Sequence, residues 1–334
     1  MGDFKINGYT PTNIQLNGTD VQKIYNGSEL VWPPSSPPPC MFEPANKTQL
    51  QIAVDLWVSN RTSAIATYGQ INTWCTGNVT DMSYLFQNKT TFNDNISNWD
   101  TSNVTNMFRT FNGASSFNQN INSWDTSSVN NMQQMFVGAT AFNGDISSWD
   151  TSNVTDMSQM FIRAIAFDKN IGSWDVSNVN NMYLMFYDAT AFNQDLSSWD
   201  VSSVTNMNGM FWYATSFNNG QASGISTWDV SNVTNMAIMF LGASSFNQDL
   251  NTWVIGSVTS MNSMFKDASA FNGEIGSWDV SSVTSMAYMF QSATVFNKDL
   301  TGWCVTSITS EPSQFSFNSA LTQANKPVWG TCPP

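Results

Sequence analysis

The sequence predicts an α/β repeat solenoid that is right-handed, contains about ten units of 25 residues and carries a parallel sheet along one side. A tryptophan recurs every 25 residues, with one step of 29, and apolar residues keep a fixed phase with it. Within each unit, a spacing typical of a strand gives way to a three- and four-residue spacing typical of a helix. The recurring residues are Trp74, Trp99, Trp124, Trp149, Trp174, Trp199, Trp228, Trp253, Trp278 and Trp303.

Each unit begins with the pattern Ile-x-x-Trp-x-Thr/Val-x-x-Val, which predicts a short strand with the tryptophan pointing inward. The pattern is similar to that of leucine-rich repeats, with tryptophan in a leucine position. Residues 151–161 illustrate the helical spacing that follows, and a Ser or Asn is available to cap the helix. Methionine and phenylalanine recur at fixed core-like positions, which favours a packed core over a Met-rich binding groove. The residues expected on one helical face are Val154, Met157, Met160 and Phe161.

The ends of the chain do not share the repeat. Short apolar stretches separated by Asn-Gly pairs predict a small N-terminal β-module for attachment, followed by a stiff Pro-rich linker. An amphipathic helix over 46–58, capped by Asn46 and burying Leu50, Val54 and Trp57, is expected to cover the first repeat. The predicted divisions are 1–33 for the β-module, 34–39 for the linker, 40–70 for the helical cap, 71–328 for the repeats and 329–334 for the C-terminal tail.

Composition excludes several functions. The chain has no histidine, so it cannot build a Ser-His-Asp triad, a Cys-His dyad or a His-ligated metal site. The formal net charge of −13 disfavours binding to nucleic acid or anionic lipid. No apolar run approaches the roughly 18–20 residues of a membrane span, and the first residues lack a signal-peptide pattern. We therefore expect no enzyme activity, no cofactor, no metal site and no membrane insertion.

An aspartate follows the tryptophan in seven units and predicts a column of carboxylates on the outside of the stack. In the simpler interpretation, each carboxylate accepts hydrogen bonds from Ser and backbone N–H groups of the next turn. Alternatively, the column is a binding strip for cations or sugar hydroxyls, although calcium needs 6–8 oxygen ligands at one site. The candidate binding strip consists of Asp100, Asp125, Asp150, Asp175, Asp200, Asp229 and Asp279.

Two further sets of residues recur with the repeat. Eight units carry an Asn, from Asn93 to Asn297, and a ninth carries Asp168 at the same place, which predicts a stacked structural ladder. Cysteines fall at the two ends of the repeat region without zinc-finger spacing. The positions favour one disulfide at each end, Cys40–Cys75 and Cys304–Cys332, although the four residues allow three connectivities.

The segment 192–211, Phe-Asn-Gln-Asp-Leu-Ser-Ser-Trp-Asp-Val-Ser-Ser-Val-Thr-Asn-Met-Asn-Gly-Met-Phe, resembles the BspA-like repeat also found in mycoplasma surface lipoproteins. The resemblance covers about residues 41–329 and implies surface display and binding without catalytic residues. More weakly, residues 6–33 resemble short leaders on phage virion proteins. Together these resemblances imply a phage or virus surface protein, such as a tail fibre, spike or capsid decoration.

In this interpretation, the N-terminal module joins other virion proteins in an assembly that contains several copies of the chain. The repeats attach the particle to a glycan or protein of the host surface. The alternative is a cell-surface or secreted bacterial adhesin.

Overall fold

The computed structural model describes two compact units, residues 1–41 and 42–334. In the first unit, two short antiparallel hairpins are present: β1 (Gln15–Leu16) pairs with β2 (Thr19–Asp20), and β3 (Ile24–Asn26) pairs with β4 (Glu29–Trp32). The linker expected at 34–39 and much of the expected β-module lie outside the described residues, so these divisions stay predictions. The residues described are 15–16, 19–20, 24–26, 29–32 and 40–333.

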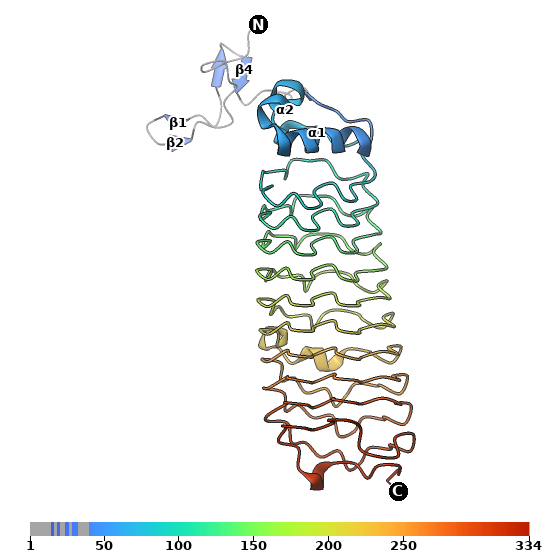
Figure 1. Ribbon diagram of the computed structural model, residues 1–334. Coiled ribbons are helices and arrows are strands. Elements are labelled where there is room, and N and C mark those ends of the chain that lie inside the picture. Colours follow the sequence, from blue (N-terminus) through green and yellow to red (C-terminus); the bar gives the residue numbers. More distant parts are fainter. Residues whose placement is uncertain (1–14, 17–18, 21–23, 27–28, 33–39, 334) are drawn as a thin grey trace. The chain divides into compact units, whose positions relative to one another are not determined.

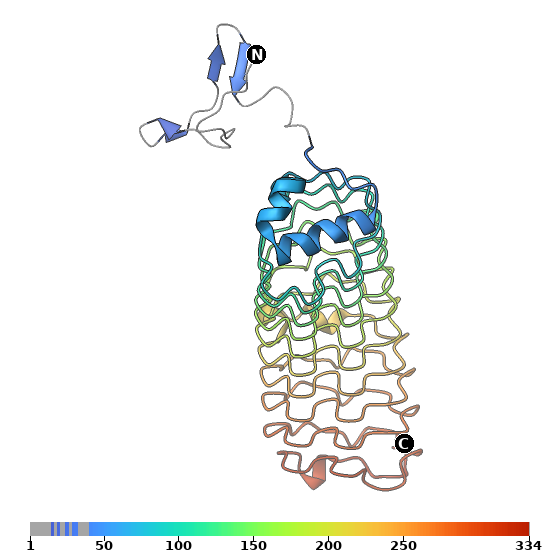
Figure 2. The same cartoon turned by 45° about the horizontal axis from the view of Figure 1, so that its top comes forward.

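The second unit begins with two helices that lie across one end of a column of stacked coils (Figures 1 and 2). Asn46 caps α1 (Lys47–Ser59) by accepting a hydrogen bond from the Gln49 backbone, as its sequence predicts. Buried Trp57 on α1 packs edge-on against Trp74 of the first coil, with ring centroids 5.8 Å apart. The sequence did not predict the second helix, α2 (Arg61–Tyr68), which Asn60 caps.

The predicted α/β architecture with a parallel sheet is wrong. Residues 69–333, all of which the structure describes, contain no strand and no α-helix, only short 3₁₀ turns and isolated parallel bridges. The leucine-rich-repeat-like arrangement of strand and helix is therefore wrong as well. Each 25-residue period forms one coil made of successive tight turns (Figure 1).

The backbone conformation explains why the three- and four-residue spacing wrongly predicted a helix. Gln159, in the stretch expected to be helical, has a φ of 62°, and Arg163, two residues beyond that stretch, has a φ of 57°. Both values lie in the left-handed region. A left-handed residue interrupts an α-helix, so the chain closes i→i−3 turns, such as Met160 N to Met157 O. The buried positions were nevertheless predicted correctly, because a tight turn also returns every third or fourth residue to the same side.

Hydrogen bonds between coils follow a simple alternation. The N–H groups of Met157, Gln159, Phe161 and Arg163 donate to carbonyl oxygens of the next coil over 2.8–3.1 Å. The intervening N–H groups close turns within the same coil. A regular parallel strand directs alternate N–H groups to opposite neighbours. Here these four N–H groups all donate to the same neighbour, and the coils stack in register without forming a regular sheet.

The core of the column consists of stacked aromatic rings and methionines, as predicted from their phase. Trp174 is 2% exposed and lies 6.2 Å from Trp149, with an interplanar angle of 6°. Its indole N–H donates to the Ile146 carbonyl of the preceding coil at 3.1 Å. Two columns of phenylalanine run beside it, and Phe161 stacks on Phe186 at 5.5 Å. Each coil therefore buries its apolar residues against its neighbours.

The predicted Asn ladder is confirmed. The Asn118 side-chain oxygen accepts the backbone N–H of Asn143 in the next coil, and Asn143 does the same for Asp168. Asp168 continues the ladder by accepting from Asn193. The bonds run from coil to coil in one direction along the column, with donor–acceptor distances of 2.8–3.1 Å.

One longer coil accommodates its four additional residues as short 3₁₀ turns. These are η2 (Asn219–Gln221) and η3 (Gly224–Thr227), shown in yellow in Figure 1, and η1 (Ile71–Thr73) opens the first coil. The side chain of Asn219 is fully buried and accepts the Leu196 N–H of the preceding coil at 2.8 Å. The insertion therefore preserves the register of the stack.

The C-terminal end of the column carries a disulfide and, as far as residue 333, no helical cap like that formed by α1 and α2 at the other end. Cys304 and Cys332 form a disulfide, as predicted, and η4 (Gln323–Asn325) lies close to it in sequence. Cys40 and Cys75 are disulfide-bonded as well, and no cysteine in the described part of the chain is free. Lys326 pairs with Glu311, the residue that replaces the repeated methionine in the last unit.

Candidate binding surfaces

The aspartates of the binding strip occupy equivalent exposed positions in seven coils. In Asp175, one carboxylate oxygen accepts both the backbone N–H of Ser177, at 3.0 Å, and its hydroxyl, at 2.6 Å. The donor lies two residues further on in the same coil. The simpler interpretation of the sequence had placed it in the next coil. The observed arrangement is the geometry of an Asx turn. The carboxylate therefore supports the local turn.

Hydrogen bonds lower the pKa of three carboxylates of the strip. The hydroxyl and then the backbone N–H of Ser177 lower the pKa of Asp175 below its usual value. Ser231 and Ser281 lower the pKa values of Asp229 and Asp279 in the same way. A hydrogen bond to the charged form favours ionisation. These side chains therefore stay charged into mildly acidic solution.

The strip is anchored to its neighbours through the backbone. In the first coils, buried threonines donate to the carbonyl oxygen of the next coil's aspartate, as Thr151 does to Asp175 at 2.8 Å.

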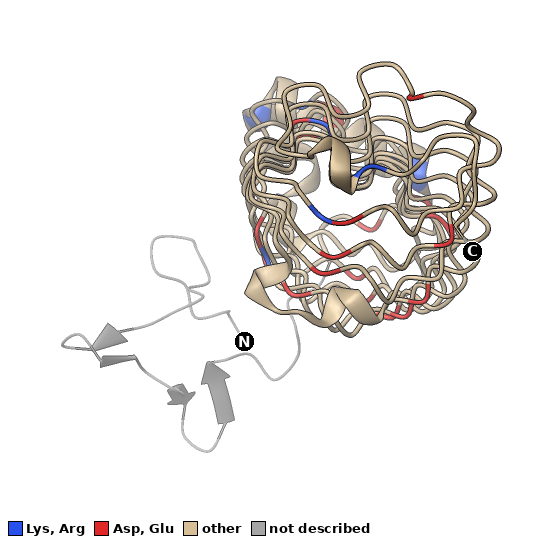
Figure 3. Cartoon of the chain, turned by 90° about the horizontal axis from the view of Figure 1, so that it is seen from below, with Lys and Arg blue, Asp and Glu red and all other residues tan. Residues whose placement is uncertain are grey.

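Acidic residues of successive coils gather mostly on one side of the ring when the column is viewed along its axis (Figure 3). No group of three or more Cys, Asp or Glu residues in the described chain is arranged to hold a metal ion. Whether the strip binds a ligand stays a prediction.

A polar depression of about 500 Å³ lies between the first two coils. Amide and hydroxyl side chains line it, and no charged or aromatic side chain does. It therefore offers hydrogen bonds to a neutral polar ligand but no flat apolar surface. The lining residues are Asn95, Ser97, Gln119, Asn120, Asn122 and Ser123.

The structure identifies a second surface that the sequence interpretation missed. We call it the variable face: the residues nine, ten, thirteen and fourteen positions after each tryptophan from Trp74 to Trp278. In these nine coils, position eight is always Met and position twelve is always Phe. Position ten, by contrast, holds seven residue types and position thirteen holds eight. Because the coils stack in register, the varying residues lie side by side, and most are half-buried or exposed. The differences between repeats, instead of their similarities, were the signal that could have found this face.

Backbone strain marks the same positions. Residues at positions ten and fourteen have positive φ in all nine coils, yet only one residue at position ten and three at position fourteen are glycine. A non-glycine residue in this conformation costs about 1–2 kcal/mol. Large side chains persist there, including Tyr84, Ile238 and Tyr288. Such strain is typical of positions that are maintained for function.

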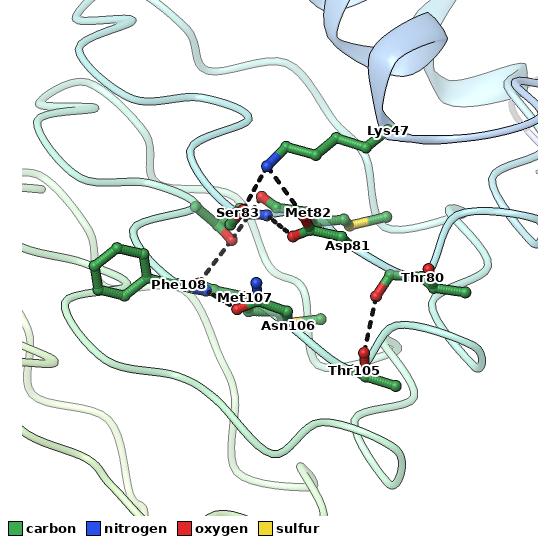
Figure 4. A network of polar contacts seen from close by, with 10 residues as sticks. Lys47, Thr80, Asp81, Met82, Ser83, Thr105, Asn106, Met107 and Phe108 are labelled. Atoms are coloured by element: carbon green, nitrogen blue, oxygen red, sulfur yellow. Dashed lines mark hydrogen bonds and ion pairs between the residues drawn. The ribbon is translucent and has the colours of Figure 1, made fainter.

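The N-terminal end of the variable face is tied to the helical cap, as Figure 4 shows. Lys47 of α1 pairs with Asp81 at 3.1 Å and with the hydroxyl of Ser83. Burial raises the pKa of Asp81, but hydrogen bonds from Ser83 and the charge of Lys47 outweigh this effect and lower it. The Lys47 ammonium also lies 5.5 Å from the ring centroid of Tyr84. The cap thereby fixes the first residues of the face.

Comparison with known proteins gives one match. The model of the family described as "Mycoplasma protein of unknown function, DUF285" matches residues 56–154, 144–223 and 219–329. The chain belongs to this family. The three matches overlap at their ends, together span residues 56–329, and confirm the expected likeness to a mycoplasma repeat. No curated protein and no solved structure matches the chain.

No helix in the described ranges combines the length and the hydrophobicity needed to cross a bilayer.

Proposed function

We propose that the chain is a non-enzymatic binding protein whose stacked coils present the variable face to a target. One observation carries the proposal: residues that pack or bond between coils repeat, whereas the side chains of the variable face differ from coil to coil. A rigid scaffold with a varied surface is the arrangement of repeat proteins that bind other molecules. The strained tyrosines on that face support the same function.

We further propose that this binding serves attachment at the surface of a phage or virus particle. In this role the N-terminal module joins the other virion proteins and the coils bind the host. The antiparallel strand pairs β1–β2 and β3–β4 support a module whose strand edges pair with another chain. The phage-like pattern of residues 6–33 supports the virion as its location.

The second candidate is an adhesin of a bacterial cell surface, of the BspA-like kind. The disulfide-bonded cysteines favour an oxidising environment, which both candidates provide. Membership of a family described from mycoplasma supports the cellular alternative.

Immunogold electron microscopy with antibodies against residues 42–334 distinguishes the two candidates. Labelling of particles supports the virion, and labelling of the cell envelope supports the adhesin. Absence from both surfaces would overturn attachment as the function. A variant lacking residues 1–33 should keep its folded column but fail to join the assembly.

Substitution tests which surface attaches. Replacing Asp150, Asp175 and Asp200 by Ser tests the binding strip, and replacing Leu184, Tyr213 and Ile238 by Ser tests the variable face. We expect the second variant to lose attachment to the target surface while circular dichroism stays unchanged. If only the aspartate variant loses attachment, the strip and not the variable face binds the target.

A further inference from the structure

The middle of the variable face differs from its two ends. Six large apolar side chains lie together there, contributed by three successive coils. Most are half-buried, and Tyr213 is 41% exposed. Polar and charged residues such as Arg163, Asp188 and Lys266 surround them. We call these six residues the central patch: Leu184, Tyr187, Trp212, Tyr213, Ile238 and Leu241.

Side chains of the patch pack against the coil that follows their own. Tyr187 stacks on Trp212 with ring centroids 4.4 Å apart. The ring of Tyr213 occupies the space where a Cβ of Gly242 would stand, and Leu184 fills the corresponding space at Gly209. Glycine at these two places of the next coil therefore lets a large side chain lie against the backbone. The rings are held in place before any partner arrives, which lowers the entropy lost on binding.

One polar atom of the patch lacks a partner. The indole Nε1 of Trp212 is buried and makes no hydrogen bond, whereas the indoles of the inner tryptophan column donate to carbonyl oxygens. An unsatisfied buried donor is uncommon and calls for an explanation. Contact of the patch with another molecule would explain the unpaired indole N–H group.

Cations distinguish Tyr213 from the other exposed tyrosines of the face. Lys47 and Arg109 lie 5.5 and 5.9 Å from the ring of Tyr84, and Lys266 lies 5.8 Å from the ring of Tyr288. Among residues 40–333, no Lys or Arg lies over the ring of Tyr213. The face of an aromatic ring attracts a cation electrostatically. The ring of Tyr213 is thus available to a cation from another molecule.

Charge favours the same occupant. The chain carries a net charge of −13, so a second copy or an anionic polymer would be repelled, whereas a basic molecule would be attracted. An apolar centre with a polar rim is the anatomy of a protein–protein interface. We propose that the central patch docks a basic protein segment that places an Arg or Lys side chain over Tyr213. This inference rests on the proposed binding function and identifies the class of partner.

A displayed library of random twelve-residue peptides, selected on the immobilised full-length protein, provides the test. We expect the selected peptides to be rich in Arg or Lys beside aromatic or aliphatic residues. A synthetic consensus peptide should bind Tyr213→Ser about tenfold more weakly, or worse, as expected for a central interface residue. Added salt should weaken binding because the acidic column attracts the peptide.

Matched controls exist in the same face. Tyr84 and Tyr288 also have positive φ and similar exposure, 41% and 39%, so Tyr84→Ser and Tyr288→Ser reproduce the backbone and surface change. We expect each control to alter peptide affinity by less than about twofold, because neither residue lies in the patch. Circular dichroism of all three variants checks that the column is intact.

Several outcomes would overturn the inference. They are failure to select any peptide, selection of acidic peptides, or binding that is equally sensitive to Tyr84→Ser. A glycan-array signal abolished by Tyr213→Ser would assign the patch to a sugar, and a dimer abolished by that change in sedimentation velocity would assign it to a second copy. If Tyr213→Ser leaves attachment intact while Tyr84, Arg109 and Gln134 are required, the docking site is wrong but the proposed function stands.

Discussion

The inner columns and the variable face come from the same short stretch of each coil, yet they follow opposite rules. In residues 182–188, Met182, Met185 and Phe186 are buried and repeat in neighbouring coils, whereas Tyr183 and Tyr187 are half-buried and do not. Packing against identical neighbours fixes a residue in every coil. A side chain that faces solvent meets no such constraint. The contrast shows that repetition reflects stability and that variation leaves room for recognition.

The largest expected effect lies in the inner column. Trp174→Ala should lower the free energy of unfolding by about 3–5 kcal/mol, because it removes a stacked ring and a hydrogen bond to Ile146. Tyr213→Ser on the variable face should change it by less than about 1 kcal/mol. Chemical denaturation of both variants measures the difference. Equal effects would contradict the division between the two regions.

The disulfide at the C-terminal end should rank next. Cys332→Ser opens a loop with a sequence separation of 28 residues. In the chain-entropy model, this should cost about 3–4 kcal/mol. Because coils bind mainly to their neighbours, the loss should appear as fraying of the last coil in hydrogen exchange. Unchanged exchange there would show that the last coil does not depend on the disulfide.

The Asn ladder should contribute less per coil. Asn143→Ala leaves the Asp168 backbone N–H without its acceptor and should cost about 1–3 kcal/mol. Asn143→Asp should largely retain stability, since Asp168 already performs this role in the next coil. Thermal denaturation of the pair separates the bond from the side-chain volume. A loss of the same size in both variants would point to packing instead.

Strain on the variable face gives a smaller effect of opposite sign. Ser263 has a φ of 54°, so Ser263→Gly should relieve left-handed strain and raise stability by up to about 1 kcal/mol. Ser263→Val should lower it, since a β-branched residue is least tolerated there. Denaturant midpoints provide the measurement. A destabilised glycine variant would mean that the conformation carries no strain.

The smallest expected effect concerns pH. The folded-state pKa values of Asp175, Asp229 and Asp279 lie below 3.8, so their hydrogen bonds contribute stability above that pH and lose it as the pH falls further. Removing the hydroxyls with Ser177→Ala, Ser231→Ala and Ser281→Ala should shift the loss to higher pH. Acid denaturation curves of the two proteins should differ in midpoint. Coincident curves would show that the hydroxyls do not support the charged form.

The sequence allowed the buried positions to be predicted but not the backbone that holds them. Regular spacing identified the tryptophan column, the Asn ladder and the capped helix, because each depends on one residue type at one place. The turns could not be predicted, because Gln159 and Arg163 adopt a left-handed conformation that usually requires glycine. The central patch was missed because it is visible only in the differences between repeats.

The hydrogen-bonding pattern between coils has a consequence for the gene. Every coil presents the same donors and acceptors to its neighbours, so a coil removed or duplicated as a unit leaves two compatible surfaces in contact. Nearly identical repeats in DNA favour unequal recombination, which changes length by whole units. Such events would lengthen or shorten the column without unfolding it and would bring new pairs of variable residues side by side. A population could therefore diversify its recognition surface by rearranging existing coils, without waiting for point mutations.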